Sequence, residues 1–167
     1  MKVLRANYKK RLLSYGGVSF FCIFGRDEVT ENKTEGDWKT PIGTFPIRKI
    51  YYRKDRIEKL DTKIESTPIS QDSIWCDDSQ LPEYNTFTKL PFHGSHENLW
   101  RDDELYDIII VIGYNDKPVI PNKGSAIFIH LIKENMQYTK GCIAIKKEDM
   151  LSLLKKITPE TKIEISE

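Results

Sequence analysis

The sequence predicts a mainly β domain with one helix docked near its C-terminus. Runs of apolar, largely β-branched residues at 105–113 and 125–131 are typical of strands buried on both faces. Only residues 148–157 place apolar side chains at three- and four-residue steps, the period of a helix. At 167 residues, 39% of them hydrophobic, the chain is expected to form one domain over residues 1–167.

The N-terminal elements are predicted to be strands. Apolar residues on both sides of Gly16-Gly17 predict two short strands joined by a hairpin turn. Basic residues within 1–13 followed by apolar residues 18–24 superficially imitate a signal peptide. The glycine pair interrupts that pattern and no small-residue cleavage site follows, so the hairpin is favoured. Pro and Gly within 40–46 then introduce a strand that continues over 47–52.

The middle of the chain is less regular. Residues 53–72 are charged and are predicted to form a loop or a short helix. Residues 76–98 form a long irregular segment whose aromatic side chains predict order. Beyond them, acidic residues open the helix at 148–149, lysines follow in its last turn, and Pro159 stops it. A short alternating strand closes the chain.

Composition excludes several classes of protein. The net charge is +1 and the lysines are scattered, so no nucleic-acid surface is indicated. No apolar stretch approaches the roughly 18 residues of a membrane span. The three cysteines, Cys22, Cys76 and Cys142, contain no Cys-x-x-Cys pair and argue against a disulfide framework.

One histidine and one cysteine suggest chemistry. His130 ends the apolar run 125–131, and Cys142 follows Gly141 after a short polar loop. A thiol with its free pKa of about 8.5 becomes a strong nucleophile when a base or a cation lies beside it. Spacing alone does not show whether the two side chains meet.

The motifs around this pair resemble the catalytic domain of the bacterial L,D-transpeptidases of the YkuD type, in a compact single-domain branch. The resemblance covers residues 15–157 and rests on several segments in a fixed order. They are EGDWKTPIGTF at 35–45, WCDD at 75–78, YN at 84–85, SHENLWR at 95–101, LYD at 105–107, GSAIFIH at 124–130 and TKGC at 139–142. It implies a mixed β-sandwich or barrel-like fold with one C-terminal helix, which includes residues 18–25 in the domain.

The resemblance also implies a mechanism. Cys142, as a thiolate, attacks the carbonyl between an L-centre and D-Ala in a peptidoglycan stem tetrapeptide, and His130 manages the protons. Backbone N–H groups around Gly141 and Cys142 stabilise the oxyanion. The expected substrate-binding residues are Trp75, His96, Arg101, Thr139 and Lys140. No metal or cofactor is expected.

Two positions depart from the common family signature. Lys140 replaces the usual histidine, and Ala144 stands where Arg or Asn is expected. The missing arginine would serve recognition of a peptide carboxylate or of the acceptor, and Arg101 is a candidate substitute because a guanidinium grips a carboxylate in a bidentate fork. Lys140 either favours the thiolate by its charge or is a solvated loop residue.

The acceptor of the acyl group decides the reaction. Water gives an L,D-carboxypeptidase, whereas an amine gives a transpeptidase that forms cross-links or exchanges D-amino acids. Because no leader, membrane segment or wall-binding module is recognised, we expect a bacterial cytoplasmic protein, with the periplasm as the alternative. Such a protein meets muropeptides rather than polymerised wall, which favours water.

Two other classes stay open. One is a zinc protein with Cys76, Asp77, His93 and His96 as ligands. The other is a non-catalytic wall-peptide binder, suggested by the losses at positions 140 and 144. The oligomeric state is not predicted.

Overall fold

Eight strands close into a ring that organises the computed structural model, which describes residues 2–167. They are β1 (Val3–Asn7), β2 (Leu12–Tyr15), β3 (Val18–Ile23), β6 (Gly43–Tyr52), β11 (Ile108–Ile112), β12 (Phe128–Leu131), β13 (Ile143–Ile145) and β14 (Lys162–Ser166). The order is β11-β12-β13-β3-β2-β1-β14-β6, and β6 pairs back to β11. The pairs β1–β14 and β12–β13 are parallel and the others antiparallel. The predicted mainly β, mixed, barrel-like fold is confirmed.

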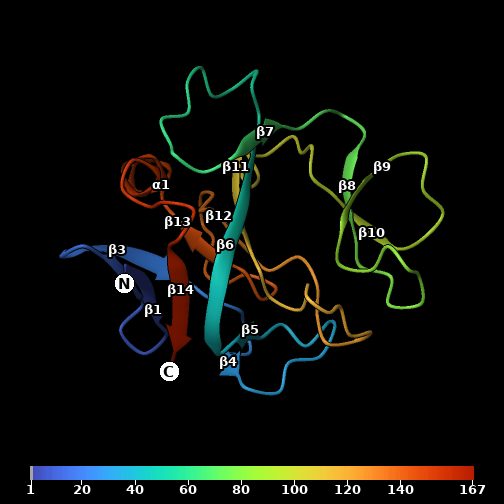
Figure 1. Cartoon of the computed structure of the whole chain (residues 1–167), viewed down its shortest axis with the longest axis horizontal. Helices are drawn as coiled ribbons and strands as arrows, with labels where there is room; N and C mark the ends of the chain where they lie inside the picture. The colour runs from blue at the N-terminus through green and yellow to red at the C-terminus, as the bar shows by residue number, and fades with distance from the viewer. Residues whose placement is uncertain (1) are drawn as a thin grey trace.

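Smaller elements surround the ring. Strand β7 (Ser66–Pro68) extends it beside β6, and β4 (Val29–Thr30) pairs with β5 (Thr40–Pro41). A separate sheet, in the order β10-β8-β9, contains β10 (His96–Asn98), β8 (Ser73–Cys76) and β9 (Phe87–Lys89). It stands to one side of the ring, on the right in Figure 1, and the two chain ends lie together on the opposite side. The long segment 76–98 is therefore ordered, as its aromatic residues predict.

The other sequence-based elements are largely in place. Tyr15 pairs with Val18 across the Gly16-Gly17 turn, which confirms the hairpin. Of residues 53–72, predicted as a loop or a short helix, 53–65 form a loop, Ser66–Pro68 form strand β7, and none is helical. The helix α1 (Lys147–Leu154) ends three residues before the apolar pattern does, and Lys155 caps it. No helix between residues 2 and 167 has the length and apolar character needed to cross a membrane.

Two hydrophobic clusters divide the interior. The larger one takes side chains from all eight ring strands and from α1, so it fills the ring. The smaller one lies between the ring and the β10-β8-β9 sheet. Strand β11 serves both, with Ile108, Ile110 and Ile112 on one face and Ile109 and Val111 on the other. This explains why its sequence shows no polar alternation.

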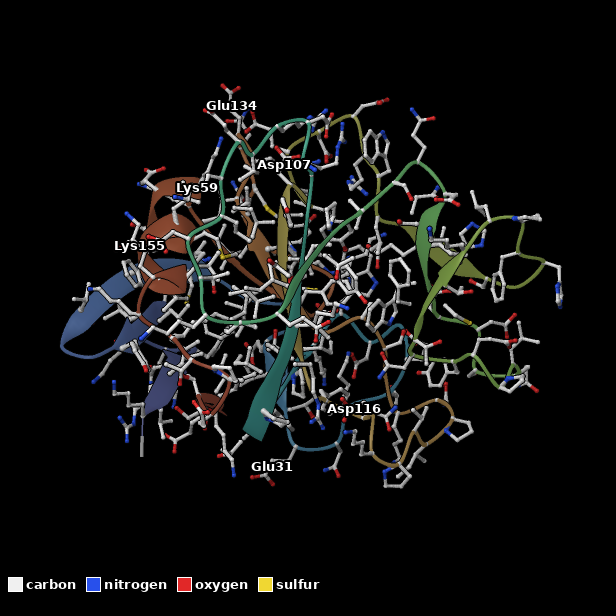
Figure 2. The ribbon with its side chains drawn as sticks, turned by 45° about the horizontal axis from the view of Figure 1, so that its top comes forward. Glu31, Lys59, Asp107, Asp116, Glu134 and Lys155 are labelled. Atoms are coloured by element: carbon white, nitrogen blue, oxygen red, sulfur yellow. The ribbon has the colours of Figure 1, made fainter. Side chains whose placement is uncertain are left out.

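Charged side chains lie mainly at the periphery. Glu31, Lys59, Glu134 and Lys155 are exposed and project outward in Figure 2. Asp107 is an exception, because it is buried and its Oδ1 forms an ion pair with Arg56 Nη1 at 2.9 Å. Four of the ten buried polar or charged residues within 2–167, Lys33, Ser125, His130 and Thr139, line one cleft.

Strand β12 is shorter than the apolar run predicts. The run begins at Ser125, yet the strand begins at Phe128. Ala126 has a positive φ of 54°, and its N–H donates to the side-chain Oδ1 of Asn85 at 3.0 Å instead of to a neighbouring strand. This bend turns the Ala126 carbonyl toward the cysteine described below.

Candidate active site

A cleft of about 900 Å³ contains most of the predicted site residues. Its lining includes residues from the loop 33–38, from β10, from 101–106 and from 125–142. Seven of the eight predicted side chains line it; they are His96, Arg101, His130, Thr139, Lys140, Gly141 and Cys142. Trp75 does not.

The parallel pairing of β12 with β13 brings the histidine and the cysteine together. Ile129 pairs with Ile143, and His130 with Ala144. Cys142, one residue before β13, therefore lies beside Phe128, whose N–H donates to Cys142 Sγ at 3.4 Å. His130 and Cys142 occupy one face of adjacent strands, two positions apart. Strand geometry separates the Cα atoms of such residues by about 8 Å, within reach of an imidazole side chain.

Cys142 is a neutral thiol in the resting site. Its side chain is 8% exposed, and Sγ donates a hydrogen bond to the Ala126 carbonyl at 3.1 Å. Burial raises the pKa of the Cys142 thiol to about 12, and the nearby charge of Glu97 adds to that effect. The expected thiolate therefore forms only when a base removes the proton during the reaction.

His130 has the protonation state of such a base. Its Nδ1 lies 3.0 Å from the Leu131 carbonyl, which only accepts hydrogen bonds. We therefore assign the proton to Nδ1, which leaves the lone pair on Nε2. Burial lowers the pKa of His130 to about 4, so the ring is neutral at pH 7.

The turn before the cysteine is held by the Thr139 hydroxyl. It accepts the Gly141 N–H at 3.0 Å and donates to the Cys142 carbonyl at 2.6 Å. The Gly141 N–H, one of the expected oxyanion donors, is therefore already engaged. The Cys142 N–H has no hydrogen-bond acceptor within residues 2–167, which makes it the available donor.

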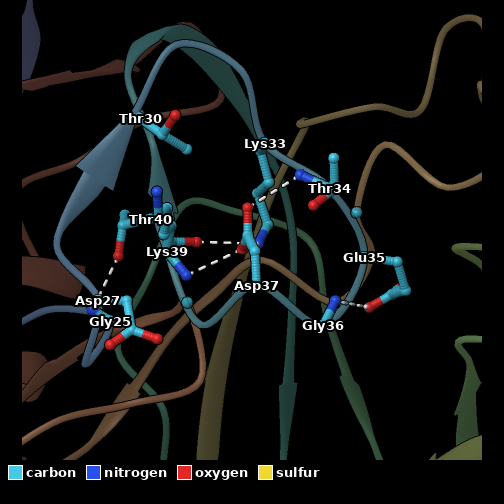
Figure 3. Close-up of polar contacts among 12 residues, drawn as sticks. Gly25, Asp27, Thr30, Lys33, Thr34, Glu35, Gly36, Asp37, Lys39 and Thr40 are labelled. Carbon is cyan, nitrogen blue, oxygen red and sulfur yellow. Dashed lines mark hydrogen bonds and ion pairs between the residues drawn. The ribbon is translucent and has the colours of Figure 1, made fainter.

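A strap, residues 33–39, packs against this turn. Gly141 has φ +139°, and a Cβ there would lie 2.9 Å from the Lys39 carbonyl. Lys33 is 5% exposed and donates from Nζ to Asp37 Oδ1 at 2.7 Å and to the Lys39 carbonyl at 2.9 Å (Figure 3). Although burial acts in the opposite direction, the Lys33 ammonium and two backbone N–H groups hold the pKa of Asp37 below its usual range. The close contact explains why position 141 requires glycine.

Arg101 and Lys140 are the two cationic side chains among the predicted substrate-binding residues. The Arg101 guanidinium grips both oxygens of Asp103 at 2.8 Å each and lies 5.6 Å from the Tyr106 ring centroid. Lys140 is exposed, with Nζ 5.3 Å from the Trp38 ring centroid. The substituted Ala144 is fully buried beside His130, so its strand offers no polar group to the cleft.

Trp75 and His96 have more local contacts. Trp75 is 7% exposed and donates from Nε1 to Asn85 Oδ1 at 3.0 Å, the same oxygen that receives the Ala126 N–H. Through Asn85, Trp75 therefore helps to hold the bend that directs the Ala126 carbonyl toward Cys142. His96 lines the cleft, with Nδ1 2.8 Å from the Gly94 carbonyl.

Sequence reasoning missed Tyr106 and Lys33, whereas Glu97 lies in the motif at 95–101 whose residues it considered for the wall of the substrate site. Glu97 and Tyr106 lie in two of the motifs that carry the family resemblance, and that was their only signal. The Tyr106 hydroxyl donates to Glu97 Oε1, and its ring packs edge-on against His130 at 5.4 Å. Lys33 precedes the motif at 35–45 and has no local signal, because its role depends on contact with Gly141.

The structure gives the zinc alternative no support. Within residues 2–167 no three His, Cys, Asp or Glu side chains are arranged to hold a metal ion. His96 pairs with Cys76 across β10 and β8, yet the His96 ring is engaged with a backbone carbonyl.

A mixed β ring that presents a buried cysteine beside a neutral histidine is the architecture of a cysteine-enzyme catalytic domain. The chain belongs to the YkuD family of L,D-transpeptidase catalytic domains, whose profile matches residues 2–165. Members of this family are cysteine enzymes that act on peptidoglycan.

Solved structures share the fold at low identity. Bd1075 from Bdellovibrio bacteriovorus is 15% identical with a TM-score of 0.52, and the match covers 99% of this chain and 47% of that one. Pgp2, a helical cell shape determining protein from Campylobacter jejuni, is 16% identical with a TM-score of 0.51 and coverages of 99% and 47%. L,D-transpeptidase 3 from Mycobacterium tuberculosis, in complex with a faropenem-derived adduct, is 12% identical with a TM-score of 0.50 and coverages of 99% and 60%.

This chain thus spans about half to three fifths of the length of these proteins. No curated protein sequence matches it.

Proposed function

We propose that this domain transfers the acyl group of peptidoglycan stem tetrapeptides through Cys142, releasing D-alanine, with water as the acceptor. One observation carries the proposal: Cys142 and His130 lie on adjacent strands in one cleft, and the contact of His130 Nδ1 with the Leu131 carbonyl leaves Nε2 free. Membership of the YkuD family supplies the substrate class.

The residues support a two-step reaction. His130 Nε2 takes the thiol proton while Cys142 Sγ attacks the carbonyl of the L-centre to D-Ala bond. The Cys142 N–H donates to the oxyanion. The C–N bond then breaks, and His130 returns its proton to the departing amine, leaving a thioester. Water, deprotonated by His130, attacks the thioester and releases the tripeptide and the thiol.

The resting hydrogen bonds set a condition on the first step. Cys142 Sγ must leave the Ala126 carbonyl before its proton reaches His130. We expect substrate binding to trigger this change, because a bound peptide excludes water and aligns its carbonyl with the sulfur. The neutral ground state also keeps the free enzyme weakly reactive toward other electrophiles.

The composition of the cleft favours water as acceptor. Ala144 adds no polar group beside His130, so the contact that an Arg or Asn would make with an incoming peptide is missing. Arg101, held by Asp103 at the edge of the cleft, is the group we assign to a carboxylate of the donor peptide.

Incubation with a tetrapeptide muropeptide tests the proposal. We expect tripeptide and free D-alanine by mass spectrometry, and a loss of at least about 10³-fold in rate for Cys142→Ala. Cross-linked or D-amino-acid-exchanged product would show that the domain is a transpeptidase and not a hydrolase. Tetrapeptide that stays intact with the wild-type protein would contradict both.

A covalent probe separates an enzyme from a peptide binder. If Cys142 is a live nucleophile, a carbapenem will add its mass to the wild-type protein and leave Cys142→Ala unmodified. An unmodified wild-type protein at high drug concentration would favour the binder.

A further inference from the structure

Glu97 places a carboxyl group in the cleft without a cation beside it. It lies on β10, is partly exposed to the cleft, and accepts one hydrogen bond, at Oε1, from the Tyr106 hydroxyl. No Lys, Arg or His nitrogen in residues 2–167 comes within 4.0 Å of it. Asp37 and Asp103, which are sequence neighbours of cleft-lining residues, each have a cation within 2.8 Å. The other two acids that line the cleft, Glu35 and Asp77, also have no ion pair within that part of the chain and accept hydrogen bonds from hydroxyl groups.

An unpaired carboxylate here opposes the proposed chemistry. Its charge disfavours the thiolate of Cys142, since it adds to the effect of burial on that thiol. Burial, with Asp77 nearby, also raises the pKa of Glu97 itself, although the Tyr106 hydroxyl acts in the other direction. A partly buried acid that works against the nucleophile requires another explanation, and a cation brought by the ligand provides one.

We propose that Glu97 binds a primary ammonium group on the side chain of the stem peptide, next to the bond that Cys142 attacks. This inference rests on the proposed function for the identity of the peptide. The pairing neutralises the carboxylate only when such a substrate is present, and so removes its effect on the thiol at that moment.

The geometry favours an ammonium over a guanidinium. A guanidinium is best bound by both oxygens of a carboxylate in a fork. Tyr106 already donates to Oε1, so Oε2 is the oxygen without a donor from residues 2–167, which suits the compact point charge of an ammonium better than a fork that uses both oxygens. Arg101 and Lys140 act on Glu97 electrostatically, but neither nitrogen lies within ion-pair distance of its carboxyl group.

Tyr106 connects this contact with the base. Its hydroxyl fixes the Glu97 carboxyl and its ring edge fixes the His130 imidazole. A substrate ammonium held at Glu97 is therefore positioned relative to His130 through one buried side chain.

Two synthetic tetrapeptides test the inference, one with a free side-chain amine at its third residue and one with that amine acetylated. We expect the wild-type protein to prefer the free amine by about 10-fold or more in kcat/KM, the value of a charged hydrogen bond in a partly buried site. Glu97→Gln should reduce the preference to within about threefold. Glu35→Gln, which alters another acid of the same cleft, should keep it.

Binding measurements keep this test independent of turnover. In the Cys142→Ala background, calorimetry should show the same preference in Kd, lost in Cys142→Ala/Glu97→Gln. If binding discriminates but no peptide is cleaved by the wild-type protein, the proposed function fails and the inference about Glu97 stands. Equal Kd values for the two peptides, or a preference that survives Glu97→Gln, would overturn the inference.

Discussion

The two sides of the cleft treat ionisable groups differently. On the strap, Lys33 and Asp37 are paired with each other at 2.7 Å and with backbone groups, so their charges are satisfied within the protein. On the other side, Glu97, Tyr106 and His130 lie close together without a counter-ion among them. Paired charges fix the shape of the strap, whereas unpaired groups favour their neutral forms and remain available to a ligand.

This contrast has consequences for catalysis. Lys33 favours the Cys142 thiolate and Glu97 disfavours it, and burial outweighs both in the resting site. The site therefore becomes reactive only when its substrate is bound. The substrate aligns its carbonyl with the Cys142 sulfur and, by our inference, brings a positive charge.

The largest effect is expected from breaking the paired side. Lys33→Met leaves Asp37 partly buried without its cation, and loss of one partner from a buried pair typically costs about 3–5 kcal/mol. We expect the free energy of unfolding, measured by urea titration at pH 7, to fall by about 3 kcal/mol. The exposed pair Arg5–Glu164 offers a control, since Arg5→Met should change it by less than about 1 kcal/mol. A loss as small as that of the control would show that the strap does not depend on its ion pair.

The next effect concerns the unpaired side at acid pH. The folded-state pKa of His130 is about 4, against an ordinary value of 6.5. Between these values the unfolded chain binds a proton that the folded chain does not, so stability falls as pH decreases from 6.5 to 4. The contribution reaches about 3 kcal/mol at pH 4.

Comparison of the wild-type protein with His130→Gln measures this contribution. The free energy of unfolding of the variant should be flatter by about 3 kcal/mol over that pH range. Parallel pH profiles of the two proteins would mean that folding does not lower the pKa of His130.

The smallest effect is expected for Glu97→Gln. Because the pKa of Glu97 is raised by folding, its carboxylate lowers stability as pH rises through that folded-state value. The neutral amide still accepts from Tyr106 and carries no charge. We expect the free energy of unfolding at pH 7 to stay within about 0.5 kcal/mol of wild type or to increase. A loss of 2 kcal/mol or more would place Glu97 among the stabilising, satisfied groups, like Asp37.

Local sequence patterns were sufficient for most of the fold. The hairpin at Gly16-Gly17, the buried run of β11 and the helix at 147–154 each follow from periodicity or turn chemistry within a few residues. The bend at Ala126 was missed because an amide 41 residues away, on Asn85, holds it. Patterns within a segment do not report such contacts.

The site shows the same division. His130 and Cys142 were recognisable from their residue types and flanking motifs, because nucleophilic catalysis restricts which side chains serve. Thr139 accepts the Gly141 N–H, so the Cys142 N–H is left as the oxyanion donor. This arrangement depends on the conformation of one turn. The buried role of Lys33 could not be predicted, since a lysine on a polar loop is normally solvated.

By itself, then, the sequence predicted the hairpin, the buried strands, the docked helix and a candidate nucleophile with its candidate base, because these predictions depend on local hydrophobic period and on side-chain chemistry. Only the tertiary structure decided that β12 and β13 pair in parallel with His130 beside Ala144, that the strap meets Gly141, and that Glu97 faces the cleft without a cation. Those outcomes depend on which distant segments bury each other, and on the desolvation and charge that burial imposes.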